Sequence, residues 1–134
     1  MFAAAELAAV LDRAAAGGVT CTLAPATGPD DLEQVSGLAA AHPGEGVVAL
    51  GFHPHEARHL DGEAKRRLQR LLAGTGVVAV GEIGLDYHYD LSPREQQRAA
   101  FVWQLALARE AGLPVVLHHR EAWEDFLAAL DAVP

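Results

Sequence analysis

The sequence predicts an α/β protein of one domain, residues 1–134, in which about four parallel strands and their covering helices form a partial TIM (β/α)8 barrel. Three observations predict this fold. Helical and strand-like segments alternate along the whole chain. The strand-like segments are short, continuous apolar runs, as expected for strands covered on both faces. Residues suited to chemistry follow the second, third and fourth runs, and sites form at the carboxyl ends of parallel strands.

The first half of the chain alternates two helices with two strands. Leu7 and Leu11 recur at helical spacing, and Gly17-Gly18 ends this first helix. Cys21 falls in the first apolar run, so we expect a packed thiol in a strand. The expected elements are a helix over residues 3–16, a strand over 19–24, a helix that enters at 27–30 and ends at His42-Pro-Gly44, and a strand over 46–51.

The second half contains the clearest helix start. Ser92 can be the N-cap, Pro93 occupies the first helical position, and Glu95 can complete a capping box. Gly112 suits the end of the same helix. The expected elements are a helix between Asp61 and Gly74, a strand over 77–81, a helix over 92–112, a strand over 113–117 and a last helix over 123–130.

Composition and charge limit the partners. With 10 basic and 18 acidic residues the net charge is −8, which argues against a basic surface that grips nucleic acid non-specifically. A bound divalent metal could still supply local positive charge. The single cysteine excludes an internal disulfide and favours a reducing cytoplasm. No apolar run approaches the roughly 18 residues of a membrane span, so we expect no membrane segment.

The stretch Val78-Ala-Val-Gly-Glu-Ile-Gly-Leu-Asp-Tyr87 places two carboxylates at the end of the third strand. We expect Glu82 in a glycine-flanked turn, with Asp86 close behind. A carboxylate at the carboxyl end of a buried strand suits a metal ion or a reacting water. The alternative is that the glycines only shape a loop and that both carboxylates are solvated.

Histidines supply the other candidate ligands. His118 follows a strand expected beside that of Glu82, so the two side chains can converge. Imidazole with carboxylate suits Zn, Mn, Fe or Ni better than Ca. His53-Pro-His55 is either a metal-binding pair or a loop pair that lines the pocket. Arg120 either binds an anionic substrate oxygen or makes a local salt bridge.

For the remaining histidines and aromatic residues we expect ordinary roles. The expectation is an exposed loop or helix-end position for His42, His59 and His88, and packing for Tyr87, Tyr89 and Trp103.

Four motifs together resemble the TatD family of metal-dependent deoxyribonucleases. They are Gly51-Phe-His-Pro-His55, Gly81-Glu-Ile-Gly-Leu-Asp-Tyr87, Asp90-Leu-Ser-Pro-Arg-Glu-Gln-Gln97 and Leu113-Pro-Val-Val-Leu-His-His-Arg120. The resemblance covers nearly the whole chain. It implies a TIM-barrel hydrolase that binds two divalent metals (Mg, Mn or Zn) and cleaves DNA phosphodiesters.

The same resemblance implies residue roles. Glu82 would be the carboxylate that bridges the metals, and His118 would be a metal-binding histidine. His119 falls on the variable position of an H-x-R motif and would not be a ligand. His53 would line the pocket and contact substrate, together with Arg120.

The chain also departs from the family pattern. The family has an initial strand with D-x-H-x-H and a later histidine and aspartate, and none of these is present between Met1 and Pro134. We therefore expect an incomplete fragment with weak metal binding, little or no nuclease activity, and exposed sheet edges through which it could self-associate. Whether this polypeptide is itself an enzyme stays open. The alternatives are a non-catalytic remnant that serves as an interaction module, and a hydrolase of another small substrate such as a cyclic amide or ester.

Overall fold

The computed structural model describes residues 4–41 and 46–133. Its elements are α1 (Ala4–Ala16), β1 (Thr22–Pro25), α2 (Leu32–Ala41), β2 (Gly46–Leu50), the 3-10 helix η1 (Pro54–His59), α3 (Gly62–Leu71), β3 (Val77–Asp86), α4 (Arg94–Ala111), β4 (Val115–Arg120) and α5 (Trp123–Asp131). The predicted alternation of helices and strands is confirmed. The predicted helix start at Ala3, the helix end at His42-Pro-Gly44 and the exposure of His42 lie outside the described residues.

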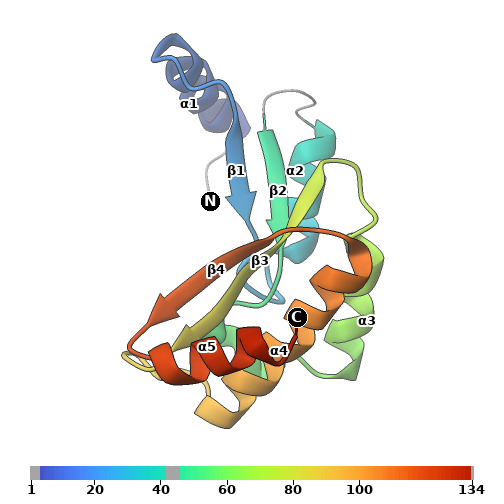
Figure 1. The fold of residues 1–134 in the computed structure, drawn as a ribbon. Helices are drawn as coiled ribbons and strands as arrows, with labels where there is room; N and C mark the ends of the chain where they lie inside the picture. Colours follow the sequence, from blue (N-terminus) through green and yellow to red (C-terminus); the bar gives the residue numbers. More distant parts are fainter. Residues whose placement is uncertain (1–3, 42–45, 134) are drawn as a thin grey trace.

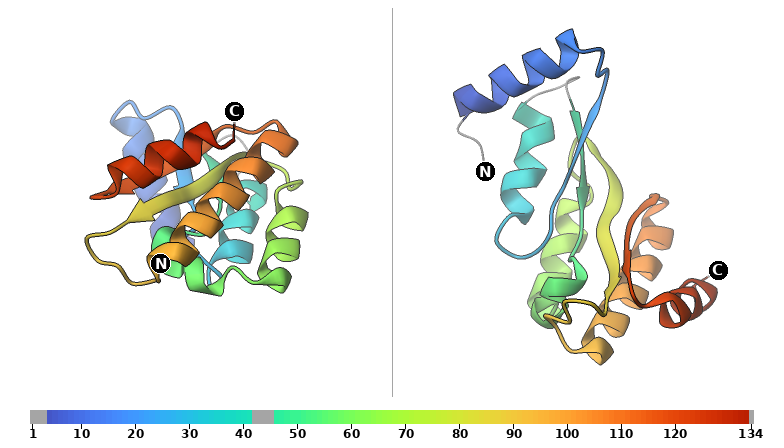
Figure 2. Two further views of the ribbon diagram at one scale, coloured as in Figure 1. Left: turned by 60° about the horizontal axis from the view of Figure 1, so that its bottom comes forward. Right: turned by 90° about the vertical axis from the view of Figure 1, so that its left-hand side faces the viewer.

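The four strands form one parallel sheet in the order β1-β2-β3-β4 (Figure 1). The sheet is a half-barrel, so the predicted partial α/β barrel is confirmed. Helix α1 lies at one end of the molecule, and α3, α4 and α5 gather at the other (Figures 1 and 2). None of the helices in residues 4–41 and 46–133 has the length and apolarity that a membrane crossing requires.

The core is aliphatic, with two buried phenylalanines at its centre. Ile83 and Leu85 on β3 are fully buried, as are Phe52 and Phe101. The ring of Phe101 stacks on Phe126 of α5 at a centroid distance of 5.1 Å. These contacts join β3, α4 and α5 beneath the edge of the sheet where β3 and β4 end.

Strand β1 differs from the prediction. It begins at Thr22, so Cys21 precedes the strand and is exposed, and the expectation of a packed thiol is wrong. Leu23 is 44% exposed and Val19 is 47% exposed. The physical reason is that β1 pairs with β2 alone among the described strands, so one of its edges has no strand beside it.

The N-termini of α3 and α4 are capped differently. Asp61 is the N-cap of α3, because its Oδ1 accepts hydrogen bonds from the N–H groups of Glu63 and Ala64 at 2.9 Å each. The capping box of α4 is wrong: Pro93 is the N-cap and makes no side-chain cap bond. The buried Ser92 hydroxyl instead donates to the His55 carbonyl at 2.7 Å and so ties η1 to the start of α4.

Candidate metal centre

Strand β3 is longer than predicted and carries the candidate carboxylate inside it. It continues to Asp86, so Glu82 lies in a strand and not in a turn. Between Val80 and Ile83, β3 has one more residue than β4 has between its paired positions, which is a bulge at Glu82. Bulges redirect side chains, and this bulge lies at the residue whose carboxylate reaches His118.

The pairing of β3 with β4 sets which side chains share a face. Side chains alternate along a strand, so Glu82, Gly84 and Asp86 lie on one face. His118 is paired with Gly84, and Arg120 with Asp86, so both belong to that face. A Cβ on Gly84 would lie 1.9 Å from the carbonyl oxygen of His118. Glycine is therefore required for β4 to bring His118 this close.

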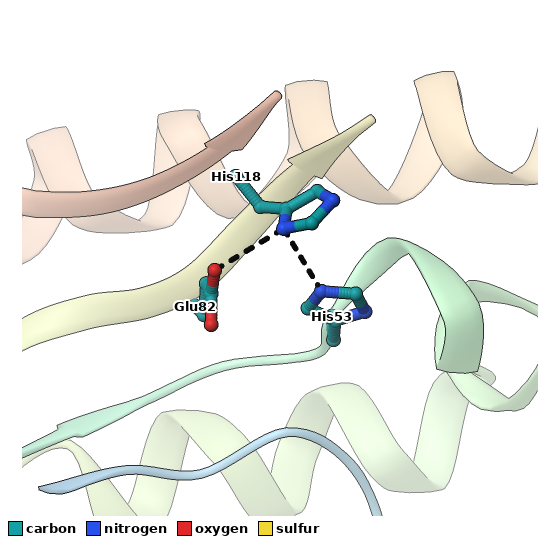
Figure 3. A group of neighbouring side chains, drawn as sticks. All are labelled: His53, Glu82 and His118. Atoms are coloured by element: carbon teal, nitrogen blue, oxygen red, sulfur yellow. Dashed lines mark hydrogen bonds and ion pairs between the residues drawn. The ribbon is translucent and has the colours of Figure 1, made fainter. Parts of the chain in front are cut away.

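Three side chains converge: Glu82 from within β3, His118 from β4 and His53 from the segment just after β2 (Figure 3). The Nδ1 atom of His118 lies 3.2 Å from Oε1 of Glu82 and 3.2 Å from Nε2 of His53. One donor atom from each of the three residues lies within 4.8 Å of the others. Two imidazoles and a carboxylate form a donor set that catalytic zinc sites use, and they can hold a divalent ion.

Asp86 is a buried carboxylate that holds the rings of His55 and His118 in place. It is fully buried, and its Oδ2 accepts from Nε2 of His55 at 2.8 Å and from Nε2 of His118 at 3.1 Å. Burial alone would raise the pKa of Asp86. Hydrogen bonds from the Tyr89 N–H, His55 and His118 outweigh burial and hold the pKa well below its usual value. The carboxylate therefore stays charged and orients both imidazoles.

The hydrogen bonds also decide which nitrogen of each ring carries a proton. The His55 N–H donates to Nδ1 of His53 at 3.2 Å, so the proton of a neutral His53 lies on Nε2. His118 donates from Nε2 to Asp86, which leaves a lone pair on its Nδ1. That lone pair lies 3.2 Å from Oε1 of Glu82 and 3.2 Å from the protonated Nε2 of His53, which can donate to it. A cation between His118 and Glu82 would take the place of this donor. The residues present therefore fit a metal ion.

The protonation of His53 agrees with this role. Burial, followed by the neighbouring imidazoles of His118 and His55, lowers the pKa of His53 to about 4. At neutral pH this side chain is therefore an uncharged imidazole, which can donate from Nε2 to an acceptor, or bind a cation at Nε2 in the other neutral tautomer, with its proton on Nδ1.

His119 and Arg120 are not among the three converging donors. His119 lies on the opposite face of β4, where its ring packs at 5.2 Å from both Trp123 and Phe126. Arg120 is exposed, with its guanidinium 4.5 Å from the centroid of the Tyr89 ring. Tyr89 is 54% exposed, so the expectation that it packs is wrong.

The prediction missed the importance of Asp86 because it placed Glu82 in a turn. The alternative that both carboxylates are solvated is wrong for Asp86, which is 0% exposed. The signal was available in the spacing: residues four apart in a strand lie on the same face. A strand carried through to Asp86 would have placed both carboxylates beside His118.

Fold and site together define a class: parallel α/β barrel proteins with a candidate metal centre at the carboxyl ends of the strands. Residues 2–133 match the family described as TatD related DNase. The chain belongs to this family.

Curated relatives and solved structures give the same result. The chain is 43% identical over 122 residues to a protein of Pantoea ananatis named 3'-5' ssDNA/RNA exonuclease TatD, covering 91% of this chain and 47% of that one. A protein of the same name from Rahnella sp. is 38% identical, with 90% and 46% covered.

Among solved structures, a TatD homologue from Escherichia coli k12 superposes with a TM-score of 0.85 at 34% identity, covering 95% of this chain and 49% of that one. A hydrolase of the TatD family from Entamoeba histolytica also gives a TM-score of 0.85, at 25% identity, with 95% and 45% covered. The chain therefore spans about half the length of the relatives that it matches.

Proposed function

We propose that this chain carries part of the active site of a metal-dependent hydrolase that cleaves phosphodiester bonds in DNA, with Glu82 and His118 as metal ligands. The observation that carries the proposal is the convergence of Glu82 Oε1 and His118 Nδ1, 3.2 Å apart, on the face that β3 and β4 share. The curated relatives are named 3'-5' ssDNA/RNA exonuclease, which supports a nucleic-acid substrate.

Each residue of the site has a role in this proposal. One or two divalent ions, with Mg, Mn and Zn as the candidates, would supply a water of lowered pKa and neutralise charge on the phosphate. Glu82 would hold the ions through its two oxygens, and His118 through Nδ1. Asp86 keeps the His118 ring oriented by accepting from Nε2. His53 would donate from Nε2 to a substrate oxygen, and Arg120 would attract the phosphate.

The activity of the chain by itself should be low. In residues 4–41 and 46–133 the converging donors come from three residues, one carboxylate and two imidazoles. A two-metal site with open positions for water and substrate needs more donors than these. We therefore expect weak metal binding and little nuclease activity from the 134-residue polypeptide.

Calorimetric titration of Mn²⁺ or Zn²⁺ into EDTA-treated and dialysed protein tests the ligands. Glu82→Gln and His118→Ala should each weaken metal binding by about tenfold or more, whereas His53→Ala should change it less than about twofold. His59→Ala is the matched control, since His59 is an exposed histidine of η1. Unchanged binding in both Glu82→Gln and His118→Ala would contradict the proposal. An equal loss in His53→Ala would make His53 a third ligand.

A non-catalytic interaction module is the second candidate, and the negative charge of the chain favours it. The net charge is −8, and a pocket at the start of α5 is lined by Glu121, Glu124 and Asp125. Such a surface repels a nucleic-acid backbone. Metal binding at Glu82 without any hydrolysis of labelled single-stranded DNA, at any Mn²⁺ concentration, would favour this second candidate.

Self-association is a further part of the proposal. Leu23 on β1 and Leu117 on β4 are 44% and 41% exposed, and these strands are the two edges of the described sheet. Exposed edges with apolar side chains can pair with another chain. Sedimentation velocity at increasing concentration should show dimers, and Leu23→Lys should reduce them. A monomer at all concentrations would contradict self-association.

A reducing cytoplasmic setting is also part of the proposal, because the single cysteine, Cys21, is free and exposed.

A further inference from the structure

Tyr89 presents an exposed aromatic ring directly beside the metal centre. It lies three residues after the end of β3 and is 54% exposed. Its ring centroid is 5.6 Å from that of His55, whose Nε2 is bonded to Asp86. A ring of this size gains little from remaining in water, so its exposure next to a polar site suggests that it receives a ligand.

Arg120 lies against the same ring and keeps its charge available. Its guanidinium carbon is 4.5 Å from the Tyr89 ring centroid. The two other arginines near this loop are paired with carboxylates: Arg94 with Asp90 at 3.0 Å, and Arg98 with Asp125 at 3.0 Å. Arg120 has no carboxylate partner among the described residues, so its guanidinium can still bind an anion.

Asp86 also holds the Tyr89 loop in place. Its Oδ1 accepts hydrogen bonds from the backbone N–H groups of His88 at 3.0 Å and Tyr89 at 2.9 Å. Its Oδ2 accepts from His118. One buried carboxylate therefore fixes the position of the aromatic ring relative to the metal-binding histidine.

We propose that Tyr89 is a stacking platform for a nucleobase of a single-stranded substrate, with Arg120 binding the phosphate next to that base. This inference rests on the proposed function, because it places the substrate of the same site. Stacking on an aromatic ring tolerates any base, since every base has a π-face. The acidic pocket formed by Glu121, Glu124 and Asp125 disfavours phosphates on the side towards α5. The strand should therefore approach from the Arg120 side.

Fluorescence anisotropy with labelled oligonucleotides tests the platform in EDTA, where no cleavage occurs. The probes are a hexamer of thymidine and a hexamer of abasic residues with the same phosphates. Tyr89→Ala and Tyr89→Leu should each weaken binding of the thymidine hexamer by about fivefold or more, from the known worth of one stacked base. Tyr89→Phe and Tyr89→Trp should stay within about twofold of the unchanged chain. None of the four should affect the abasic hexamer.

Trp123→Ala is the matched control, because Trp123 is an equally exposed aromatic residue at the acidic pocket. It should leave the affinity for both hexamers unchanged. The platform is wrong if Tyr89→Leu binds the thymidine hexamer as well as the unchanged chain does. It is also wrong if Tyr89→Leu loses abasic binding to the same extent, since the effect would then be electrostatic or structural.

A separate measurement distinguishes failure of the platform from failure of the proposed function. Titration with deoxyadenosine monophosphate should move the Tyr89 ring protons upfield in NMR spectra. If that shift occurs but Glu82→Gln and His118→Ala bind Mn²⁺ as well as the unchanged chain does, the platform is supported and the proposed metal site fails. If those two variants lose Mn²⁺ binding and the ring protons do not move, the platform is wrong and the proposed metal site stands.

Discussion

The sheet is built differently in two places: the end where β3 and β4 finish, and the edge formed by β1. At the first end, buried Leu85, Phe101 and Phe126 support a cluster of paired polar side chains. At the second, β1 has only four residues and leaves Leu23 largely uncovered. Helix α1 beyond it lies away from α3, α4 and α5 (Figure 2). The packing around β3 and its helices is therefore more complete than the packing along β1.

The largest expected effect tests this difference in packing. Phe101→Ala should lower the free energy of unfolding by about 3–5 kcal/mol, because it empties space beneath β3 and removes the stack on Phe126. Leu23→Ala should lower it by less than about 0.5–1 kcal/mol, since its side chain is already largely in water. Urea denaturation followed by circular dichroism measures both values.

Circular dichroism of the unchanged chain and of both variants in water is the control for retained helix content. Similar losses of unfolding free energy from the two substitutions would contradict the comparison, because stability would then be spread evenly over the sheet.

The same difference explains what could be predicted from the sequence. The order of elements could be predicted because apolar runs, glycines and prolines mark them locally. Glu82 and His118 could be placed near one another because the carboxyl ends of neighbouring parallel strands share an edge. The role of Ser92 could not, because its hydroxyl satisfies groups of η1 that are 34 and 37 residues away in sequence. A local capping pattern carries no information about such distant partners.

The exposure of individual side chains could not be predicted from the local sequence either. Cys21 falls in an apolar run and Tyr89 is an aromatic residue, and packing was predicted for both. Their exposure depends on what lies next to β1 and to the loop after β3, and a residue pattern does not encode which neighbours are present. Asp86 is the opposite case: solvation was one of the two alternatives for this carboxylate, and it is instead buried and accepts from four hydrogen-bond donors.

The second effect tests whether the polar cluster stabilises the fold. Asp86→Asn keeps the shape of the side chain but removes its charge and replaces one acceptor oxygen by an NH2 group, which then faces hydrogen-bond donors. Because the side chain is 1% exposed, the loss of charge-assisted bonds should lower the free energy of unfolding by about 2–3 kcal/mol. Urea denaturation in EDTA at pH 7 measures it. Asp90→Asn, at an exposed carboxylate, is the control and should have little effect. Equal stability of Asp86→Asn and the unchanged chain would show that this cluster contributes no net stability.

The smallest effect is a pH dependence that belongs to the cluster and not to the β1 edge. The pKa of His53 is lowered from 6.5 to about 4, first by burial and then by His118 and His55. Between these two pH values the unfolded chain binds a proton that the folded chain does not. The free energy of unfolding should therefore fall as the pH drops from about 6.5 to about 4, with no further contribution from this group below that range. The effect should be modest, because His53 is only partly buried and solvent screens its charge.

Urea denaturation at several pH values in EDTA should give a shallower slope of unfolding free energy against pH for His53→Gln than for the unchanged chain. His59→Gln, at an exposed histidine of η1, should keep the original slope. If both variants keep it, the acid sensitivity arises outside the cluster, and the contrast between the two ends of the sheet would be one of packing alone.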